Sequence, residues 1–460
     1  MEPRKSFVFI FNIYGERFFY MLTANLKGCE IIMKKNTINV GILGLGTVGQ
    51  GTLKILQENK EFIEQKIYPK KIILKKLADK DKTKILPGKK FYKIFTDSAE
   101  EIINDPEIDI VVETIGGFEP AKSLIMQALK TGKHVVTANK EVITKAGYEI
   151  LKLARENKVY FLFEASVASG IPIIGALSHS LTSYKLKEII GILNGTTNYI
   201  LTKMSEEGKD YEEALKEAQE KGYAEADPSK DIDGFDAFNK IFILSAIAFS
   251  AKINPDDIYY EGIRNISKLD IEYARELGYT VKLLALARNT GKDLDLRVHP
   301  ALIPKRHTLA NIGGAYNGIL IRGGDFGDLT FSGLGAGALP AGSMIVSDIV
   351  EIIKNYDNYY NQYNCFEKKK IRDFKQTYSP YYLRIRVKDR PGVLAEIAGV
   401  FARKKVSFLS VIQKGEAGEV ADIVFLTHLA KEGNAQEALT EVASLECVEK
   451  ICSVIRVVEI

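Results

Sequence analysis

The sequence predicts an α/β protein with three parts: a Rossmann-type doubly wound parallel sheet, an α+β domain, and a C-terminal βαββαβ domain. Three observations predict this architecture. A short apolar strand leads directly into a G-x-G-x-x-G turn and a helix, starting at residue 40. Strand-like and helix-like segments then alternate from about residue 38 to 165, and residues 383–387 alternate apolar with polar side chains. A chain of 460 residues is also too long for one ordinary core.

The glycine turn reads G-L-G-T-V-G from Gly44 to Gly49. Gly44 permits the tight turn, and Gly46 removes the side chain that would keep a pyrophosphate from the backbone. Gly49 lets the next helix lie close to the strand, while Thr47 and Val48 lie in its first turn, where free N–H groups favour phosphates. The pattern predicts a nicotinamide dinucleotide site. A flavin site or a turn without a ligand is the alternative.

The first part of the chain has the rhythm of βαβ units, which predicts a parallel sheet covered by helices on both faces. Ligands bind such sheets at the carboxyl ends of the strands. Thr114 ends one predicted strand and Lys140 closes the T-A-N-K run at the end of the next, so both belong to the predicted site. The predicted strands are residues 38–43, 71–78, 108–114, 134–138 and 159–164, with a helix at 120–130 between two of them.

The rest of the chain divides by composition. Strands are expected near 186–193 and 295–298, helices at 212–221 and 235–251, and tight turns in the glycine-rich stretch 323–342. The βαββαβ pattern comprises residues 382–387, 393–403, 406–413, 420–427, 435–444 and 448–458. The predicted boundaries are an N-terminal extension of doubtful relevance at 1–32, a dinucleotide-binding domain at 33–168, a substrate-binding domain at 169–355, a linker at 356–380 and a C-terminal domain at 381–460.

Composition excludes several classes of protein. The 63 basic and 59 acidic residues leave a net charge of +4 without a long basic block, so no nucleic-acid partner is expected. The longest apolar stretch, residues 241–249, is too short to span a membrane. The four cysteines lack C-x-x-C spacing, which argues against disulfides and structural zinc and favours a cytoplasmic location. Residues 1–32 resemble an over-long start assignment more than a signal peptide.

Three segments suggest one catalytic site: E-A-S-V-A-S-G-I-P-I at 164–173, G-Y-A-E-A-D-P at 222–228 and D-I-D-G-F-D-A-F-N-K at 231–240. Asp236 and Lys240 are four residues apart and share a face in the first turns of an apolar helix. The helix N-terminus disfavours a cation there, whereas the carboxylate favours it, so the ammonium is placed to exchange a proton. The alternative is an ordinary ion pair of small energetic effect.

Together these motifs resemble homoserine dehydrogenase, in the long form with a C-terminal ACT domain. The resemblance covers about residues 36–458. It also includes T-I-G-G at 114–117, T-A-N-K at 137–140, L-N-G-T-T-N-Y at 193–199 and, for the ACT domain, D-R-P-G-V-L-A at 389–395. Seven motifs in the family's order make it specific.

The resemblance implies reversible hydride transfer between L-homoserine and L-aspartate 4-semialdehyde with NAD or NADP, on the route to threonine and methionine. It implies that Lys240 donates the proton and that Lys140 assists beside the nicotinamide. Glu225, Gly222 and Asp236 would contact the substrate. The implied site for a monovalent cation, Na⁺ or K⁺, comprises Glu164, Val167, Ser169 and Ile171, with serine at 169 where many relatives carry glycine.

Cofactor choice depends on the end of the second strand. Asp79 follows this strand, and a carboxylate there binds both ribose hydroxyls of NAD and repels a 2′-phosphate. Asp81 is the alternative if the register differs by two. Many relatives carry arginine nearby, which favours NADP. The sequence favours NAD, with NADP as the alternative.

The resemblance also implies regulation and assembly. ACT modules pair and bind an amino acid at the turn after their first strand, which here contains Asp389, Gly392 and Leu394. Threonine is the expected effector, and a homodimer or homotetramer is the expected assembly. The alternative is that this domain only dimerises. Two competing functions are a phosphoglycerate dehydrogenase type of enzyme, which needs a histidine acid/base, and a non-catalytic amino-acid sensor.

Overall fold

The computed structural model describes residues 6–13, 16–23, 35–84, 91–324, 327–361, 363, 366–414 and 419–458. The chain divides into two units, one N-terminal and one comprising residues 37–460. In the first unit, β1 (Ser6–Ile13) and β2 (Glu16–Thr23) form an antiparallel hairpin. The hairpin lies in the predicted N-terminal extension, whose relevance stays a prediction.

The nucleotide-binding part contains the predicted parallel sheet. Its six strands lie in the order β5-β4-β3-β6-β7-β8. β6 and β7 are buried along their whole length, because helices cover both faces of the sheet, as expected for apolar runs such as I-V-V-E. The strands are β3 (Thr37–Leu43), β4 (Lys71–Ala78), β5 (Phe95–Thr96), β6 (Ile110–Glu113), β7 (His134–Thr137) and β8 (Phe161–Leu162).

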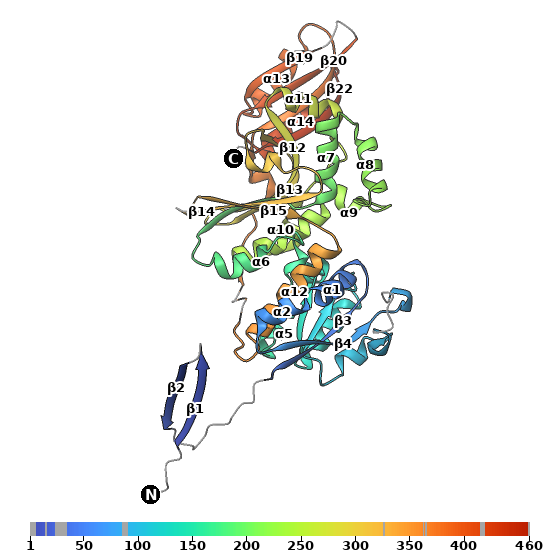
Figure 1. The fold of residues 1–460 in the computed structure, drawn as a ribbon. Coiled ribbons are helices and arrows are strands. Elements are labelled where there is room, and N and C mark those ends of the chain that lie inside the picture. The colour runs from blue at the N-terminus through green and yellow to red at the C-terminus, as the bar shows by residue number, and fades with distance from the viewer. Residues whose placement is uncertain are drawn as a thin grey trace. The chain divides into compact units, whose positions relative to one another are not determined.

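One helix of this part comes from far along the chain. α12 (Ala338–Lys354) packs beside α1 (Thr47–Glu58), where a Cβ on Gly51 would lie 1.9 Å from the Ala338 carbonyl oxygen. Figure 1 shows the orange α12 next to the blue α1. The expected tight turns at 323–342 are therefore wrong: β15 (Asp328–Leu334) and the start of α12 occupy this stretch, and glycines there permit close packing. The other helices are α2 (Lys60–Ile67), α3 (Glu100–Ile103), α4 (Ala121–Lys130) and α5 (Lys140–Glu156).

The second sheet is mixed and has ten strands, in the order β15-β14-β9-β12-β13-β22-β18-β20-β19, with β11 beside β13. β13 (Leu294–Pro304) is much longer than the predicted 295–298. It carries the buried polar residues Asp295, Arg297 and His299, so its sequence lacks the apolar alternation that would have indicated the full strand. The other strands of its central part are β9 (Leu186–Ile192), β11 (Tyr259–Tyr260), β12 (Tyr279–Asn289) and β14 (Tyr316–Gly323).

The C-terminal part has the predicted βαββαβ order and its own apolar core. Its sheet continues the central sheet, because β22 pairs in parallel with β13 through Ala301 with Arg456 and Leu302 with Val457. Figure 1 shows these red strands adjoining the yellow ones. The elements are β18 (Tyr381–Lys388), α13 (Val393–Arg403), β19 (Phe408–Lys414), β20 (Val420–Thr427), α14 (Glu432–Val442) and β22 (Val448–Val457).

The predicted linker also makes backbone contacts. Within it, β16 (Glu367–Lys368) pairs with β10 (Ala251–Lys252), and β17 (Tyr378–Ser379) pairs with β21 (Ala430–Lys431). The domain boundaries themselves stay a prediction. 

The helices of the central part place the candidate site. α10 (Phe235–Ala248) is buried from Asp236 to Ala246, and no helix in the described ranges is long and apolar enough to cross a membrane. The remaining helices are α6 (Ile173–Gly175), α7 (Gly195–Glu207), α8 (Tyr211–Glu220), α9 (Ser229–Ile232) and α11 (Lys268–Glu276).

Candidate active site

The glycine turn has the geometry that a dinucleotide needs. Gly44 has φ +93°, and its N–H donates to the Ala78 carbonyl at 2.8 Å. The Thr114 hydroxyl donates to the Gly44 carbonyl at 2.7 Å, and a Cβ on Gly49 would lie 2.0 Å from that same oxygen. A Cβ on Gly46 would meet nothing within 4 Å, so this side of the turn is open. The turn therefore fits a pyrophosphate beside Gly46.

The Asp79 carboxylate is hydrogen-bonded to the same turn. Its carboxylate accepts the Leu45 N–H at 2.6 Å and the Asp81 N–H at 2.9 Å, and Lys84 Nζ lies 3.2 Å away. Burial opposes ionisation of Asp79, but these two N–H groups and Lys84 lower its pKa. Asp81 instead bonds the exposed N–H of Thr83 at 2.9 Å. Of the two carboxylates considered from the sequence, Asp79 is the one that contacts the glycine turn.

Two lysines, one from the nucleotide-binding part and one from the central part, share one buried carboxylate. Lys240 Nζ lies 2.8 Å from Asp236 Oδ2, and Lys140 Nζ lies 2.6 Å from Asp236 Oδ1. Lys140 begins α5, with two residues between it and the end of the parallel strand β7, whereas Asp236 and Lys240 lie in the first turns of α10. Lys240 also donates to the Leu193 carbonyl at 2.6 Å. Three residues that the sequence assigned to one site therefore lie in direct contact.

The two lysines differ in their environment. The Lys240 side chain is 8% exposed, and that of Lys140 is 40% exposed. Burial lowers the pKa of Lys240, and the opposing attraction of Asp236 does not fully compensate. Asp236 raises the pKa of Lys140. Burial alone would raise the pKa of Asp236, but the two ammonium groups hold it below its usual range. Lys240 is thus the lysine that gives up a proton more readily.

Sequence reasoning missed several polar groups of this cluster. The Asn194 amide donates to Asp236 Oδ2 at 2.9 Å and to Asp231 Oδ1 at 2.7 Å, and the Thr196 hydroxyl donates to Asp231 Oδ2 at 2.9 Å. Asn317 donates to the Leu193 carbonyl at 3.0 Å. Asn194 and Thr196 lie in the L-N-G-T-T-N-Y motif, which was a usable signal. Asn317 stands alone in β14 and has no sequence signal.

Glu225 and Gly222 lie in the segment between α8 and α9. Glu225 is exposed, and its charge helps to raise the pKa of Lys140. Gly222 has φ +75°, a conformation that favours glycine and turns the chain after α8. No hydrogen bond between the Glu225 carboxylate and either lysine exists within the described residues. Their roles toward a substrate stay predictions.

Glu164, one of the four predicted cation ligands, bonds the start of a short helix. The Glu164 carboxylate accepts the N–H groups of Ile174 at 2.7 Å and Gly175 at 2.6 Å, at the start of α6. Burial raises the pKa of Glu164 to about 7. The Glu164 N–H donates to the buried carboxylate of Asp348 at 2.9 Å. In the part of the chain that the structure describes, no three His, Cys, Asp or Glu residues are grouped to hold a metal ion. This finding gives no support for metal binding, and the cation site at Glu164 stays a prediction.

The loop after Glu164 carries the other three predicted cation ligands. Ala168, and not Ser169, has a positive φ, at 51°. The Ile171 carbonyl accepts the Ile173 N–H at 2.8 Å, and Val167 is fully buried. Position 169 therefore does not have the positive φ that would favour glycine over serine.

The predicted effector turn lies at the start of α13. Gly392 is the N-cap and has φ +95°, and Leu394 is 45% exposed. The Asp389 carboxylate accepts from Gln413 at 3.3 Å, and its N–H donates to the Glu419 carbonyl at 3.0 Å. The turn is formed as expected, and its ligand stays a prediction.

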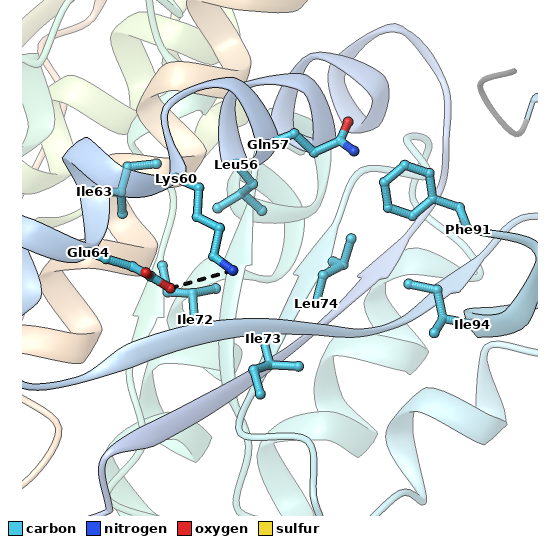
Figure 2. A pocket seen from close by; sticks show the side chains of 10 residues that line it. All are labelled: Leu56, Gln57, Lys60, Ile63, Glu64, Ile72, Ile73, Leu74, Phe91 and Ile94. Carbon is cyan, nitrogen blue, oxygen red and sulfur yellow. Dashed lines mark ion pairs between the residues drawn. The ribbon is translucent and has the colours of Figure 1, made fainter. Parts of the chain in front are cut away.

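A separate apolar pocket of about 530 Å³ lies between α1, α2 and β4. Figure 2 shows that Leu56, Leu74 and Phe91 line it and that its charged residues, Lys60 and Glu64, pair with each other. It contains none of the predicted site residues, so it is not the candidate active site.

Comparison with known proteins agrees with this geometry. Residues 172–350 match homoserine dehydrogenase, residues 44–164 match the homoserine dehydrogenase NAD binding domain, and residues 381–447 match the ACT domain. A homoserine dehydrogenase of Synechocystis sp. is 43% identical over 435 residues, covering 92% of this chain and 99% of the relative. The chain belongs to the homoserine dehydrogenase family. It is accordingly an oxidoreductase with a nicotinamide cofactor.

Other members of the homoserine dehydrogenase family support the same assignment. The relative of Bacillus subtilis is 39% identical over 430 residues, covering 91% of this chain and 98% of its own. The crystal structure of a homoserine dehydrogenase from Thiobacillus denitrificans has a TM-score of 0.86 at 40% identity, covering 92% and 98% of the two chains. A hyperthermophilic archaeal homoserine dehydrogenase in complex with NADPH has a TM-score of 0.60 at 28% identity, covering 70% of this chain and all of the other.

Proposed function

We propose that this protein catalyses the reversible, NAD(P)-dependent reduction of L-aspartate 4-semialdehyde to L-homoserine, a step toward threonine and methionine. One observation carries the proposal: Lys240 and Lys140 flank the buried Asp236 carboxylate where α10 meets the carboxyl end of β7. The glycine turn would hold the pyrophosphate of a nicotinamide cofactor, which would supply or accept the hydride.

Lys240 is the general acid and base of the proposed reaction. Reduction of an aldehyde places negative charge on its oxygen, and a nearby ammonium both stabilises that charge and donates a proton. An ammonium has three N–H bonds. Two of those on Lys240 point to Asp236 Oδ2 and the Leu193 carbonyl, which leaves the third for the substrate oxygen. In the oxidation of homoserine, the neutral amine takes the proton back.

The neighbouring residues position the substrate. Lys140, held by Asp236 but partly exposed, belongs to the nucleotide-binding part and stabilises charge near the reacting carbon. The exposed carboxylate of Glu225 suits the α-ammonium group of the amino-acid substrate, and Gly222 shapes the turn that presents it. Asp236 keeps Lys240 oriented.

NAD is the favoured cofactor. Asp79 places a carboxylate at the end of β4, next to the glycine turn, where it repels a 2′-phosphate. Lys84 beside it is the feature that favours NADP, and the archaeal relative was solved with NADPH. A specificity constant for NADP at least about tenfold above that for NAD would reverse this assignment.

Three further parts of the proposal have their own tests. A monovalent cation at Glu164 predicts that activity depends on Na⁺ or K⁺ and is lost in tetramethylammonium buffers. Threonine binding at Asp389, Gly392 and Leu394 predicts inhibition, and an intact enzyme that ignores millimolar threonine and binds none by calorimetry would exclude it. A homodimer or homotetramer predicts a corresponding mass by light scattering.

Turnover decides the main proposal. The purified protein should reduce NAD or NADP when given L-homoserine, and it should oxidise the reduced cofactor when given L-aspartate 4-semialdehyde. A non-catalytic sensor shows neither reaction. An enzyme of the phosphoglycerate dehydrogenase type reduces the cofactor with phosphoglycerate and not with homoserine.

A further inference from the structure

Residues 259–264 lie between the C-terminal domain and the start of α10. β11 pairs in parallel with β13 through Tyr259 with Arg297, and the Glu261 N–H donates to the Val298 carbonyl at 2.8 Å. β13 is also the strand to which β22 of the C-terminal domain is attached. Segment 259–264 therefore belongs to the strand system that joins the two domains.

The C-terminal domain holds this segment by charge. Arg456 of β22 is buried and donates to Glu261 Oε2 at 2.9 Å. Its other N–H groups form a bidentate pair with Glu432 of α14, at 2.8 and 2.9 Å. The Tyr259 hydroxyl also donates to Glu261 Oε2, at 2.8 Å. Charge-assisted bonds of this kind are among the stronger hydrogen bonds, so a movement of Arg456 is expected to move Glu261.

The other side of the segment touches the backbone that begins α10. A Cβ on Gly262 would lie 1.9 Å from the Ile232 carbonyl oxygen, so the two backbones are in direct contact. The Ile263 N–H donates to that same oxygen at 2.8 Å. A Cβ on Gly234 would lie 3.0 Å from the Glu261 carbonyl oxygen. α10 starts at the next residue and carries Asp236 and Lys240.

We propose that Glu261 is a positioning residue that links the C-terminal domain to Lys240 within one chain. The link runs from Arg456 to Glu261, then through the contact of Gly262 with Ile232 to the first turn of α10. Because this contact leaves no space, a shift of Glu261 displaces the start of α10 and with it the two lysines' shared carboxylate. The inference rests on the proposed function and names the route by which the C-terminal domain acts on that site.

Glu261→Gln tests the link without removing a catalytic group. The variant loses the charge but keeps the shape, and Arg456 keeps its bidentate partner Glu432, so the fold should persist. Glu276→Gln is the matched control. Glu276 of α11 pairs with Lys414 of β19 across the same two domains but has no such contact with the start of α10.

Two measurements decide. Hydrogen exchange of amides 231–238 should be roughly tenfold faster in Glu261→Gln, which corresponds to about 1.4 kcal/mol of lost local stability, and unchanged in Glu276→Gln. The kcat for homoserine should fall about three- to tenfold in Glu261→Gln, with the KM for the cofactor unchanged. Unaltered exchange at 231–238 in Glu261→Gln, or equal changes in both variants, would overturn the proposal. If the wild-type protein shows no turnover, the proposed function fails, and the exchange data still decide the link.

Discussion

Replacing Lys240 with methionine removes the ammonium and retains most of the side-chain volume. The structure predicts that this variant folds. Asp236 keeps Lys140 Nζ at 2.6 Å and the Asn194 amide at 2.9 Å, and the Leu193 carbonyl keeps the Asn317 amide at 3.0 Å. Leaving a buried charge without a partner costs about 3–5 kcal/mol, but no charge is left so here. We therefore expect the free energy of unfolding to change by about 1 kcal/mol or less.

The effect on catalysis should be much larger. Loss of general acid/base catalysis lowers rates by about 10²- to 10⁴-fold, or about 3–5 kcal/mol in the activation barrier. We expect this loss in kcat in both directions at saturating substrate, with the Kd of the cofactor nearly unchanged. Lys145→Met, on the exposed face of α5 where Lys145 pairs with Glu141, is the control and should retain activity. Near-normal turnover of Lys240→Met, or a stability loss that accounts for the whole effect, would refute this reasoning.

Three other predictions concern the cofactor turn, the shared carboxylate and a buried histidine. Gly46→Ala should leave Tm unchanged, because the added Cβ meets open space, yet weaken cofactor binding at least about tenfold. Gly49→Ala should lower both Tm and the affinity for the cofactor, because its Cβ would clash with the Gly44 carbonyl. Calorimetry measures both quantities. Asp236→Asn should move the pH profile of homoserine oxidation to lower pH, because Lys240 loses the charge that stabilises its ammonium; an unmoved profile contradicts this. Burial lowers the pKa of His134 to about 4 in the folded protein. Below about pH 6.5 the unfolded chain therefore binds more protons at this residue than the folded chain does. The free energy of unfolding should fall by up to about 3 kcal/mol as the pH drops from about 6.5 to about 4. His134→Gln should flatten this part of the stability curve in denaturant titrations.

Local patterns were sufficient to predict five of the six strands of the parallel sheet, but not β5, which has only two residues. β4 occupies the predicted residues 71–78. In the C-terminal part, α13 occupies the predicted residues 393–403, whose apolar side chains recur at helical spacing. The turn from Gly44 to Gly49 was predicted from its glycines. The structure confirms the steric need at Gly44 and Gly49, as in the approach of Gly49 to the Gly44 carbonyl, whereas the role of Gly46 toward a pyrophosphate stays a prediction.

Contacts between distant segments were not predictable in the same way. The sequence offered no sign that α12 packs on α1, or that β22 pairs with β13 and so extends the central sheet into the C-terminal domain. The polar residues of β13 did not indicate a buried strand. Arg297 can be buried there because it bonds residues such as Ser379, which are distant in sequence. The C-terminal domain therefore looked separable from the sequence, whereas its sheet continues the central one.

The candidate site was predicted only in part, because some of its contacts join segments that are distant in the sequence. Asp236 and Lys240 are close in sequence and share a helix face, so their contact follows from helical spacing. The contact of Lys140 with Asp236 was suggested only by family resemblance, since it joins two domains. Asn317 was missed because one asparagine in a strand has no recognisable pattern.

Direct hydride transfer is the central claim, and isotope transfer tests it most directly. L-homoserine deuterated at its carbinol carbon is incubated with the protein and NAD or NADP, and the reduced cofactor is analysed by mass spectrometry. The account predicts that the deuterium appears on the nicotinamide ring, with a slower rate for the labelled substrate. Absence of a reduced cofactor, or a reduced cofactor whose new hydrogen comes from solvent, would contradict it.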